Sequence, residues 1–169
     1  MFFRRKEISK KIDRRGNEMK IFISCPFSGI LDRKTGLVKE EYKPFFDELI
    51  SFLNDKKIDY YLSITRENWG KDYISPSEST LSDYKGLKES DMVFVIPGNP
   101  ISGGVHVELG WASSLQKKIH IFLERGIRYS PVVMGLSSFC DIEYHESQNF
   151  PSKNLLKDLV NVIQSEDLR

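Results

Sequence analysis

Short apolar runs alternate along the chain with longer segments whose apolar residues recur at helical spacing. The runs are rich in β-branched and aromatic residues, as in MVFVI at 92–96, which is typical of strands buried on both faces of a parallel sheet. Strands are expected at 20–24, 58–64, 92–96, 141–144 and in the run that ends at Leu123, and helices at 42–53, 76–87, 105–115 and 155–163. This alternation predicts a three-layer α/β fold with a flavodoxin-like (Rossmann-like) parallel sheet of about five strands.

The segment 91–123 (DMVFVIPGNPISGGVHVELGWASSLQKKIHIFL) carries the most informative pattern. A strand enters a Gly-rich turn, a helix follows, and a second strand closes the segment. Glu108 is expected in the first turn of that helix, where the positive field of the helix start favours the ionised carboxylate. This pattern predicts that Glu108 acts as a nucleophile.

The Gly-rich turn offers groups that suit an anion. Gly103 and Gly104 lack Cβ atoms, so their backbone N–H groups can close on a phosphate, and Ser102 adds a hydroxyl. An ordinary helix start, entered through glycines and stabilised by an early Glu, would have the same sequence. Both interpretations stay open. The turn is not a dinucleotide-binding fingerprint, because no G-x-G-x-x-G follows the strand.

Two other stretches are expected near this turn. Residues 22–28 end the first strand, and the carboxyl ends of parallel strands face the ligand crevice, which makes Phe27 and Ser28 candidate binding residues. Residues 65–75 are polar and have no period. Trp69 in this segment either stacks on a base or pins the loop, and Arg66 is a weaker candidate for the same contact.

The helix that begins after Ser75 has a clear start signal: Ser as N-cap, then Pro76, then Glu78 closing a capping box. We expect Leu81, Tyr84 and Leu87 on its buried side. Asp83 lies close to that side rather than opposite it, which is unusual for a solvated acid. An ordinary surface Asp is the alternative.

Composition limits the class of protein. The chain has 169 residues, a formal net charge of +1 and 40% hydrophobic residues, and no apolar run approaches the ~20 residues of a membrane span. We therefore expect no nucleic-acid partner, no membrane partner and a cytoplasmic location, where Cys25 and Cys140 would be reduced thiols. A basic N-terminal extension at 1–18 is expected to precede one domain at 19–169.

The three histidines are not expected to bind metal. His106 stands two residues before Glu108, so the two side chains point to different sides of the helix. His120 and His145 are isolated in the sequence, and no Cys, His or carboxylate spacing indicates a metal site. We predict no metal and no cofactor.

Several of these motifs occur together in a known family. The succession IFISCPF, an Asp upstream of Ser90-Asp91, an apolar strand and S-G-G-V-H-V-E-L-G-W-A resembles the nucleoside 2-deoxyribosyltransferase superfamily. Within it the sequence is most similar to nucleotide N-glycosidases, namely the CMP hydrolases of antibiotic pathways and the deoxynucleoside 5'-monophosphate N-hydrolases. The resemblance covers roughly residues 20–136.

The resemblance implies roles for individual residues. Glu108 matches the nucleophile that attacks the anomeric carbon, and Asp83 matches the acid that protonates or orients the departing base. Ser102 matches a ligand of the 5'-phosphate. Ser130 resembles a phosphate ligand that a neighbouring subunit donates, which implies a homodimer or higher homo-oligomer. Residues 68–70 are similar to a loop that lines the base pocket.

The residue at position 22 is relevant to the choice between ribose and deoxyribose. Transferases and deoxynucleotide hydrolases of the family carry a Tyr there whose hydroxyl touches the nucleophile, whereas the CMP hydrolases carry Phe, as this chain does at Phe22. The resemblance thus favours a ribonucleotide, although Phe22 also suits an ordinary core position. Cys25 departs from the family, because many members have Gly there.

These features predict a nucleoside 5'-monophosphate N-glycosidase. The expected substrate is a small-molecule pyrimidine nucleotide, CMP-like, cleaved through a covalent glycosyl-Glu108 intermediate. A nucleoside 2-deoxyribosyltransferase that moves deoxyribose between bases is one alternative, and a non-catalytic nucleotide-binding sensor is another. A phosphoribohydrolase of the lysine-decarboxylase-like type is disfavoured, because its P-G-G-x-G-T block is absent.

Overall fold

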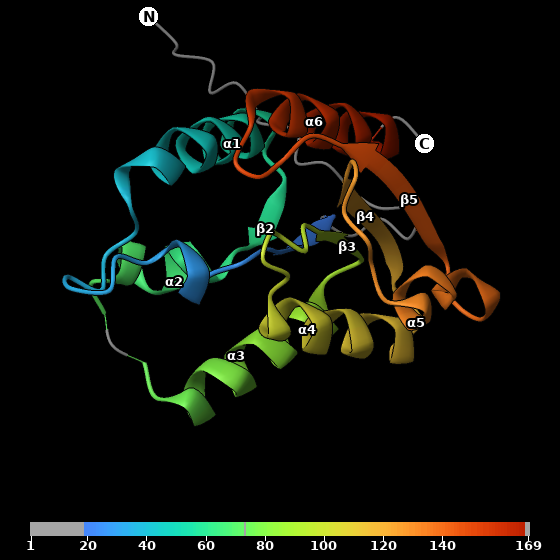
Figure 1. The fold of residues 1–169 in the computed structure, drawn as a ribbon, viewed down its shortest axis with the longest axis horizontal. Helices are drawn as coiled ribbons and strands as arrows, with labels where there is room; N and C mark the ends of the chain where they lie inside the picture. Colours follow the sequence, from blue (N-terminus) through green and yellow to red (C-terminus); the bar gives the residue numbers. More distant parts are fainter. Residues whose placement is uncertain (1–18, 73, 168–169) are drawn as a thin grey trace, which may run out of the picture.

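The computed structural model describes residues 19–72 and 74–167. Its centre is a five-stranded, all-parallel sheet in the order β2-β1-β3-β4-β5, which confirms the predicted flavodoxin-like arrangement (Figure 1). The strands are β1 (Lys20–Ser24), β2 (Asp59–Tyr61), β3 (Met92–Val95), β4 (Lys118–Glu124) and β5 (Ile142–Ser147). The predicted basic extension at 1–18 lies outside the described residues.

Helices cover both faces of the sheet. In Figure 1, α1 (Lys43–Lys56) and α6 (Lys153–Asp167) lie on one face, and α3 (Pro76–Glu89) and α4 (Gly103–Ser114) lie on the other. Two short helices, α2 (Ser63–Arg66) and α5 (Pro131–Met134), follow β2 and β4. Single 3-10 turns are η1 (Ser28–Ile30), η2 (Glu40–Tyr42), η3 (Asn68–Gly70) and η4 (Leu136–Ser138). Within the described ranges, no helix combines the length and apolar character needed to cross a bilayer.

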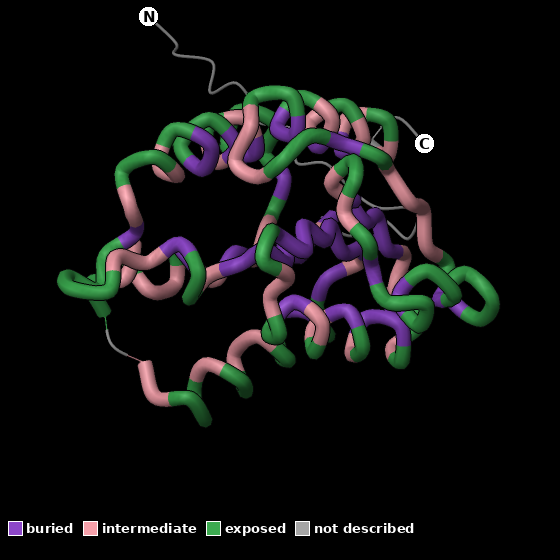
Figure 2. The backbone as a smooth tube through the Cα atoms, viewed as in Figure 1, coloured by how far each residue is buried: buried purple, intermediate pink, exposed green. Residues whose placement is uncertain are grey.

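The three inner strands, β1, β3 and β4, are almost wholly buried between these layers, whereas the edge strands β2 and β5 are only partly buried (Figure 2). Successive side chains point to opposite faces, so one strand contributes to both cores. In β1, Ile21 and Ile23 pack under α1 and α6, whereas Phe22 packs under α4. In β4, Phe122 belongs to the first core and Ile121 to the second. Burial on both faces of the sheet thus explains why these strands are continuous apolar runs in the sequence.

The second strand is shorter than predicted. Its expected range was 58–64, but β2 ends at Tyr61 and the chain turns into α2 at Ser63. Leu62 and Ile64 are each 1% exposed, so burial alone does not distinguish a strand residue from a residue of a helical turn. The hydroxyl of Thr65 donates a hydrogen bond to the Leu62 carbonyl (2.7 Å), which favours the turn.

The start of α3 is as predicted and Leu87 is buried as expected, but the other two residues of the predicted buried side are not. Ser75 and Glu78 form the capping box, with Pro76 in the first helical turn. Leu81 and Tyr84 were expected inside, yet they are 68% and 36% exposed. The helix instead approaches the sheet at Gly86, where an added Cβ would lie 2.4 Å from a ring carbon of Tyr61. Because only Gly fits there, α3 packs on the sheet through Gly86 and Leu87 near its end, and the first part of its apolar pattern stays exposed.

Candidate active site

Glu108 is a partly buried carboxylate on the sheet-facing side of α4. The helix begins at Gly103, with Ser102 as its N-cap, so Glu108 lies in the second turn and the prediction of the first turn is wrong. The field of a helix start falls off within the first turn, which leaves burial as the main influence. Burial raises the pKa of Glu108 to about 7, opposed by a hydrogen bond from Ser24. Near neutral pH the protonated and the ionised form of this carboxyl group are therefore both populated.

The hydrogen bond from Ser24 links the end of β1 to α4. Its Oγ donates to Oε2 of Glu108 in a very short contact. The next residue, Cys25, is also close enough for the charge of Glu108 to matter. Burial, and then that charge, raise the pKa of the Cys25 thiol far above its usual value, so the thiol stays protonated and unreactive. Of these two neighbouring groups, the carboxylate is therefore the candidate nucleophile.

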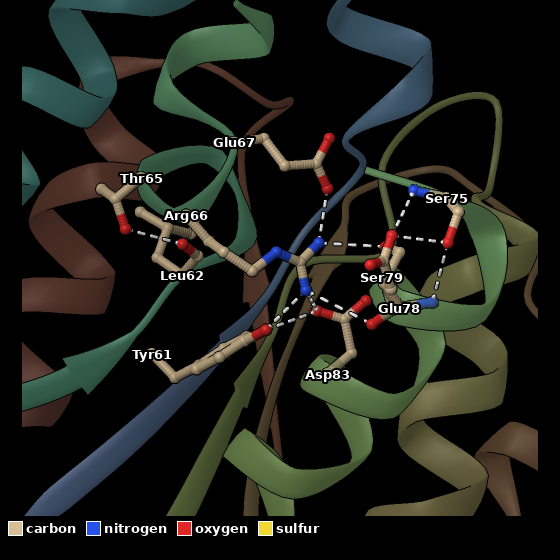
Figure 3. Close-up of polar contacts among 9 residues, drawn as sticks. All are labelled: Tyr61, Leu62, Thr65, Arg66, Glu67, Ser75, Glu78, Ser79 and Asp83. Carbon is tan, nitrogen blue, oxygen red and sulfur yellow. Dashed lines mark hydrogen bonds and ion pairs between the residues drawn. The ribbon is translucent and has the colours of Figure 1, made fainter. Parts of the chain in front are cut away.

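Asp83 comes from α3 and is the second carboxylate of the site. Its Oδ1 accepts hydrogen bonds from the hydroxyl of Tyr61 (2.9 Å) and from Nη1 of Arg66 (2.7 Å), as Figure 3 shows. Asp83 also raises the pKa of Glu108 through its charge. The two predicted catalytic residues are thus close enough to interact, as a two-carboxylate site requires.

Arg66 fixes Asp83 in place. Besides Asp83 and the Tyr61 hydroxyl (2.6 Å), its guanidinium contacts Glu67 and donates to Oγ of Ser79 (3.0 Å) (Figure 3). The side chains of Arg66 and Asp83 are only 17% and 15% exposed. A charge pair of this kind orients both groups more firmly than a solvated pair does. Arg66 therefore belongs to the site as the partner of Asp83, whereas its expected stacking on a base stays a prediction.

Phe22 reaches this network through Tyr61. The two residues are register partners in β1 and β2, and their rings stack with centroids 5.1 Å apart and planes 6° apart. Phe22 is 1% exposed, as in the core alternative left open by the sequence. Burial, and then the charge of Asp83, raise the pKa of Tyr61 well above its usual value, so its hydroxyl keeps its proton and donates. A contact between Phe22 and the sugar stays a prediction.

The Gly-rich turn borders a pocket of about 300 Å³. As predicted, the end of the first strand and the turn meet there, with Ser28 and Gly29 on one side and Ser102, Gly103 and Gly104 on the other. An added Cβ on Gly103 would meet no atom within 4 Å, so the helix start is open to a ligand. The remaining lining residues are Pro26, Ile30, Tyr42, Asn99, Pro100, Ile101 and Phe150.

Ser102 combines the two interpretations that the sequence left open. Its Oγ accepts a hydrogen bond from the backbone N–H of Val105 (3.5 Å) as the N-cap of α4. The same residue lines the pocket, one helical turn before His106 and six residues before Glu108. A turn of helix rises by about 5.4 Å, so an anion at this helix start lies within a nucleotide's reach of the carboxylate.

Three predicted site residues lie apart from this group. Phe27 packs against the core under α1. Trp69 packs edge-on against Phe46, with ring centroids 6.2 Å apart, and its carbonyl accepts from the N–H of Val38 (3.1 Å), so it does pin its loop. Ser130 is the N-cap of α5 and lines a different pocket, together with His106 of α4. Ligand contacts of all three stay predictions.

Two of the histidines are neighbours in the structure, although the sequence gives no sign of it. His120 and His145, isolated in the sequence, lie side by side in β4 and β5, with Nδ1 of His120 and Nε2 of His145 3.0 Å apart. They lie on the sheet face that α6 covers, and not beside Glu108.

Comparison with known proteins gives a consistent picture. No family model and no curated protein matches the sequence. Among solved structures, the CMP N-glycosidase BcmB of Clostridium botulinum superposes with a TM-score of 0.63 and 25% identity, covering 86% of this chain and 98% of that one. The solution structure of BlsM gives 0.69 and 28%, covering 87% and 88%. The resemblance to nucleotide N-glycosidases is confirmed.

A third structure shares the fold alone. It is a conserved protein from Enterococcus faecalis V583, with a TM-score of 0.50 and 17% identity over 87% of this chain and 98% of that one.

The likeness to the CMP N-glycosidase BcmB supports an enzyme of the glycosyl hydrolase type. The two carboxylates, Glu108 and Asp83, are the groups that such chemistry needs.

Ser24 and Tyr61 are site residues that sequence reasoning missed. Ser24 ends β1 at the crevice edge, and a polar residue at the carboxyl end of a buried strand is a usable signal. Tyr61 carries no comparable signal, because an aromatic residue in a predicted strand is ordinary. Its role depends on the pairing of β2 with β1, which places its ring beside Phe22.

Proposed function

We propose that this protein is a nucleotide N-glycosidase that hydrolyses the bond between base and sugar of a pyrimidine nucleoside 5'-monophosphate, with CMP favoured. The observation that carries the proposal is Glu108: a partly buried carboxylate with a pKa of about 7, which accepts a hydrogen bond from Ser24 and lies close enough to a second carboxylate, Asp83, to be affected by its charge. The likeness to a CMP N-glycosidase supports the choice of substrate.

The reaction proceeds in two displacements at the anomeric carbon. In the first, a carboxylate oxygen of Glu108 forms a bond to C1' while the bond from C1' to the base nitrogen breaks. The base leaves with the bonding electrons and takes up a proton. In the second, water adds to C1', the ester bond to Glu108 breaks, and the proton that the water loses to solvent balances the one that the base took up. The products are the free base and a pentose 5-phosphate, and the carboxylate is restored.

Asp83 acts at the leaving base. Its Oδ1 is engaged by Tyr61 and Arg66, which leaves Oδ2 as the oxygen that turns to a ligand. A carboxylate with this partner set is better suited to accept a hydrogen bond from the base than to give up a proton. We therefore assign Asp83 the orienting role of the two that the resemblance implies.

The phosphate is held at the start of α4. Ser102, Gly103 and Gly104 contribute a hydroxyl and backbone N–H groups, and Ser28 faces them across the pocket. A bound phosphate fixes the sugar relative to Glu108, because both groups contact the same helix. Such positioning lowers the entropy cost of the attack on C1'.

The working unit is a homodimer in which Ser130 completes the phosphate site of its neighbour. In support, Ser130 and Ser102 line different pockets within one chain, so a phosphate site that uses both residues is better formed between two chains. Apolar side chains are also exposed on the three helices of this side: Leu81 of α3 is 68% exposed, Val107 of α4 50% and Val132 of α5 77%. Exposed apolar side chains on several helices of one face suit a two-fold interface. The free thiols Cys25 and Cys140 suit a cytoplasmic enzyme.

The test is incubation of the protein with a panel of nucleoside monophosphates and the matching nucleosides. Release of free base and pentose 5-phosphate, fastest with CMP, is the expected result. A repeat with an added second base separates the alternatives, since a transferase forms a new nucleotide and a hydrolase does not. Tight nucleotide binding with no turnover of any substrate would favour a sensor and refute the proposal.

A further inference from the structure

A second polar cluster lies between β4, β5 and α6, on the sheet face opposite Glu108. His120 alternates along β4 with Ile119 and Ile121, which pack on the α4 side, so its ring points toward α6. On β5, Glu143 and His145 are two residues apart and share a face. The register pairs His120 with Glu143 and Phe122 with His145. Three metal-ligating side chains are thereby gathered from two neighbouring strands.

The donor atoms of the three residues converge. Nδ1 of His120 lies 3.0 Å from Nε2 of His145 and 3.8 Å from Oε2 of Glu143. One ligand atom from each residue lies within 4.8 Å of the others. An ion bound at ~2.1 Å from each ligand can join atoms up to ~4 Å apart, so a small movement suffices. His145 sits on the edge strand and is only partly buried, which permits that movement.

The hydrogen bonding of His120 selects the form that binds metal. Its ring is fully buried, and within the described part of the chain Nε2 has no hydrogen-bond partner. Oε1 of Glu166 on α6 lies 3.7 Å from this nitrogen. A carboxylate there favours the tautomer with the proton on Nε2, which leaves the lone pair of Nδ1 directed at His145. A carboxylate behind a ligating imidazole is the usual support of a metal site.

The charges of the cluster leave room for a cation. Lys118 contributes a positive charge to the cluster. Its Nζ lies 2.7 Å from Oε2 of Glu166 and 3.7 Å from Oε1 of Glu143. Asp158 adds a third carboxylate behind His145, where it accepts from the hydroxyl of Ser147 (2.5 Å). Each neutral imidazole has one ring nitrogen whose lone pair can bind a cation. Three carboxylates against one ammonium favour a divalent cation.

We propose that His120, His145 and Glu143 bind a divalent transition metal ion of the zinc class, with Glu166 supporting His120 from the second layer of contacts. Two imidazoles and one carboxylate are a donor set that suits Zn²⁺ and leaves a fourth position for water. On binding, the proton on Nε2 of His145 moves to Nδ1 of the same ring, so both rings stay neutral and each offers one lone pair to the ion. The ion joins β4, β5 and α6, and its distance from Glu108 across the sheet makes it a structural ion.

Titration with ZnCl₂, followed by the imidazole ¹H–¹⁵N correlations of the intact protein, tests the site directly. The expected result is one ion per chain, with the ring nitrogens of His120 and His145 shifted and those of His106 unchanged. His106 lies on α4 and serves as an internal control. Movement of the His106 signals alone, or no movement of any ring, would overturn the proposal.

Variants separate the cluster from adventitious binding. Glu143→Gln, a side chain 44% exposed and therefore tolerant of substitution, should weaken zinc binding about 10-fold or more, and His145→Gln should abolish one-to-one binding. Glu146→Gln on the same strand, whose carboxylate pairs with Arg125, is the matched control and should bind as the parent does. Zinc at ~100 times its Kd should raise the Tm of the parent by about 5–10 °C and leave His145→Gln unchanged. Equal binding or equal stabilisation of the parent and His145→Gln would refute the site.

Discussion

Ser24, the last residue of β1, donates a hydrogen bond to Glu108 in the second turn of α4. Two opposing influences therefore act on this carboxylate. Burial raises its pKa to about 7, while the Ser24 hydroxyl stabilises the ionised form and lowers it. A nucleophile needs the ionised form, yet a fully solvated carboxylate is a weak one. For the proposed nucleophile, the balance between burial and this hydrogen bond would set the pH range in which Glu108 attacks.

Ser24→Ala should move the acid limb of the pH profile of kcat/KM upward by about one pH unit. Without the hydroxyl, the ionised form of Glu108 loses a donor, so its pKa rises above 7 and less of the nucleophile is available at pH 6. At pH 9 the variant should approach the parent. Ser113→Ala, which removes a hydroxyl of α4 that bonds the Gly110 carbonyl instead, is the control. An acid limb that stays in place would mean that Ser24 does not tune Glu108.

Glu108→Gln should remove activity and at the same time stabilise the protein above pH 7. The amide cannot form the glycosyl ester, so turnover should fall by about 10³-fold or more while nucleotide still binds. The parent carboxyl holds its proton up to about pH 7 when folded but ionises near pH 4.5 when unfolded. The contribution of this group to the stability of the folded parent is therefore highest below pH 4.5 and falls as the pH rises toward 7.

Gln has no ionised form, so the gain should be on the order of 2 kcal/mol at pH 8 and vanish at pH 4. That corresponds to roughly 4–8 °C in Tm at pH 8, measured by calorimetry at both pH values. Glu48→Gln, on the exposed side of α1, should change Tm at neither pH. A gain of equal size at pH 4 and pH 8 would point to packing rather than to charge.

Arg66→Lys should lower kcat/KM by about 10-fold or more, although the charge is kept. Lys cannot reach Tyr61, Asp83 and Ser79 at once, as the guanidinium does, so Asp83 would lose its fixed orientation. If Asp83 orients the base, the loss should be alike for good and poor leaving bases. A loss concentrated on poor leaving bases would instead show that Asp83 donates a proton. Arg125→Lys, in an exposed ion pair, is the control.

The fold was predictable because burial on both faces leaves a strong sequence signal. Apolar runs located the strands, and the capping box at Ser75 located the start of α3. The errors arose where a neighbour overrides the local pattern. Leu81 faces outward because Gly86 brings α3 against the ring of Tyr61, a contact between segments far apart in the chain.

The candidate site was predictable only in part, for a similar reason. Glu108 and Asp83 carry motif signals, whereas the role of Tyr61 follows from strand pairing. His120 and His145 are 25 positions apart and become neighbours only through the register of β4 and β5. Side chains that meet across parallel strands leave no fixed spacing in the sequence, so their contacts need the structure.

Phe22→Tyr should shift preference toward deoxynucleotides. The ring of Phe22 is buried against Tyr61, and a hydroxyl added at its edge would extend from the core toward the site. If it reaches the sugar, it competes for the space and the hydrogen bonds of the 2'-OH. The measurement is the ratio of kcat/KM for ribo- and deoxynucleotides. Phe94→Tyr is the control, because Phe94 lies on β3 and points to the opposite face of the sheet from Phe22. An unchanged ratio would show that Phe22 is a core residue only.

Ser130 should act in the site of the neighbouring subunit, and mixed dimers can show it. Glu108→Gln and Ser130→Ala chains, each nearly inactive alone, would form hybrids in which one site carries both defects and the other carries none. With random exchange, half of the dimers are hybrids with one intact site, so activity should recover to about one quarter of the parent. Glu108→Gln mixed with Asp83→Asn is the control, because Asp83 and Glu108 interact within one chain and every hybrid site stays defective. If verified exchange gives no recovery with Ser130→Ala, or if the active protein sediments as a monomer, Ser130 serves its own chain or none.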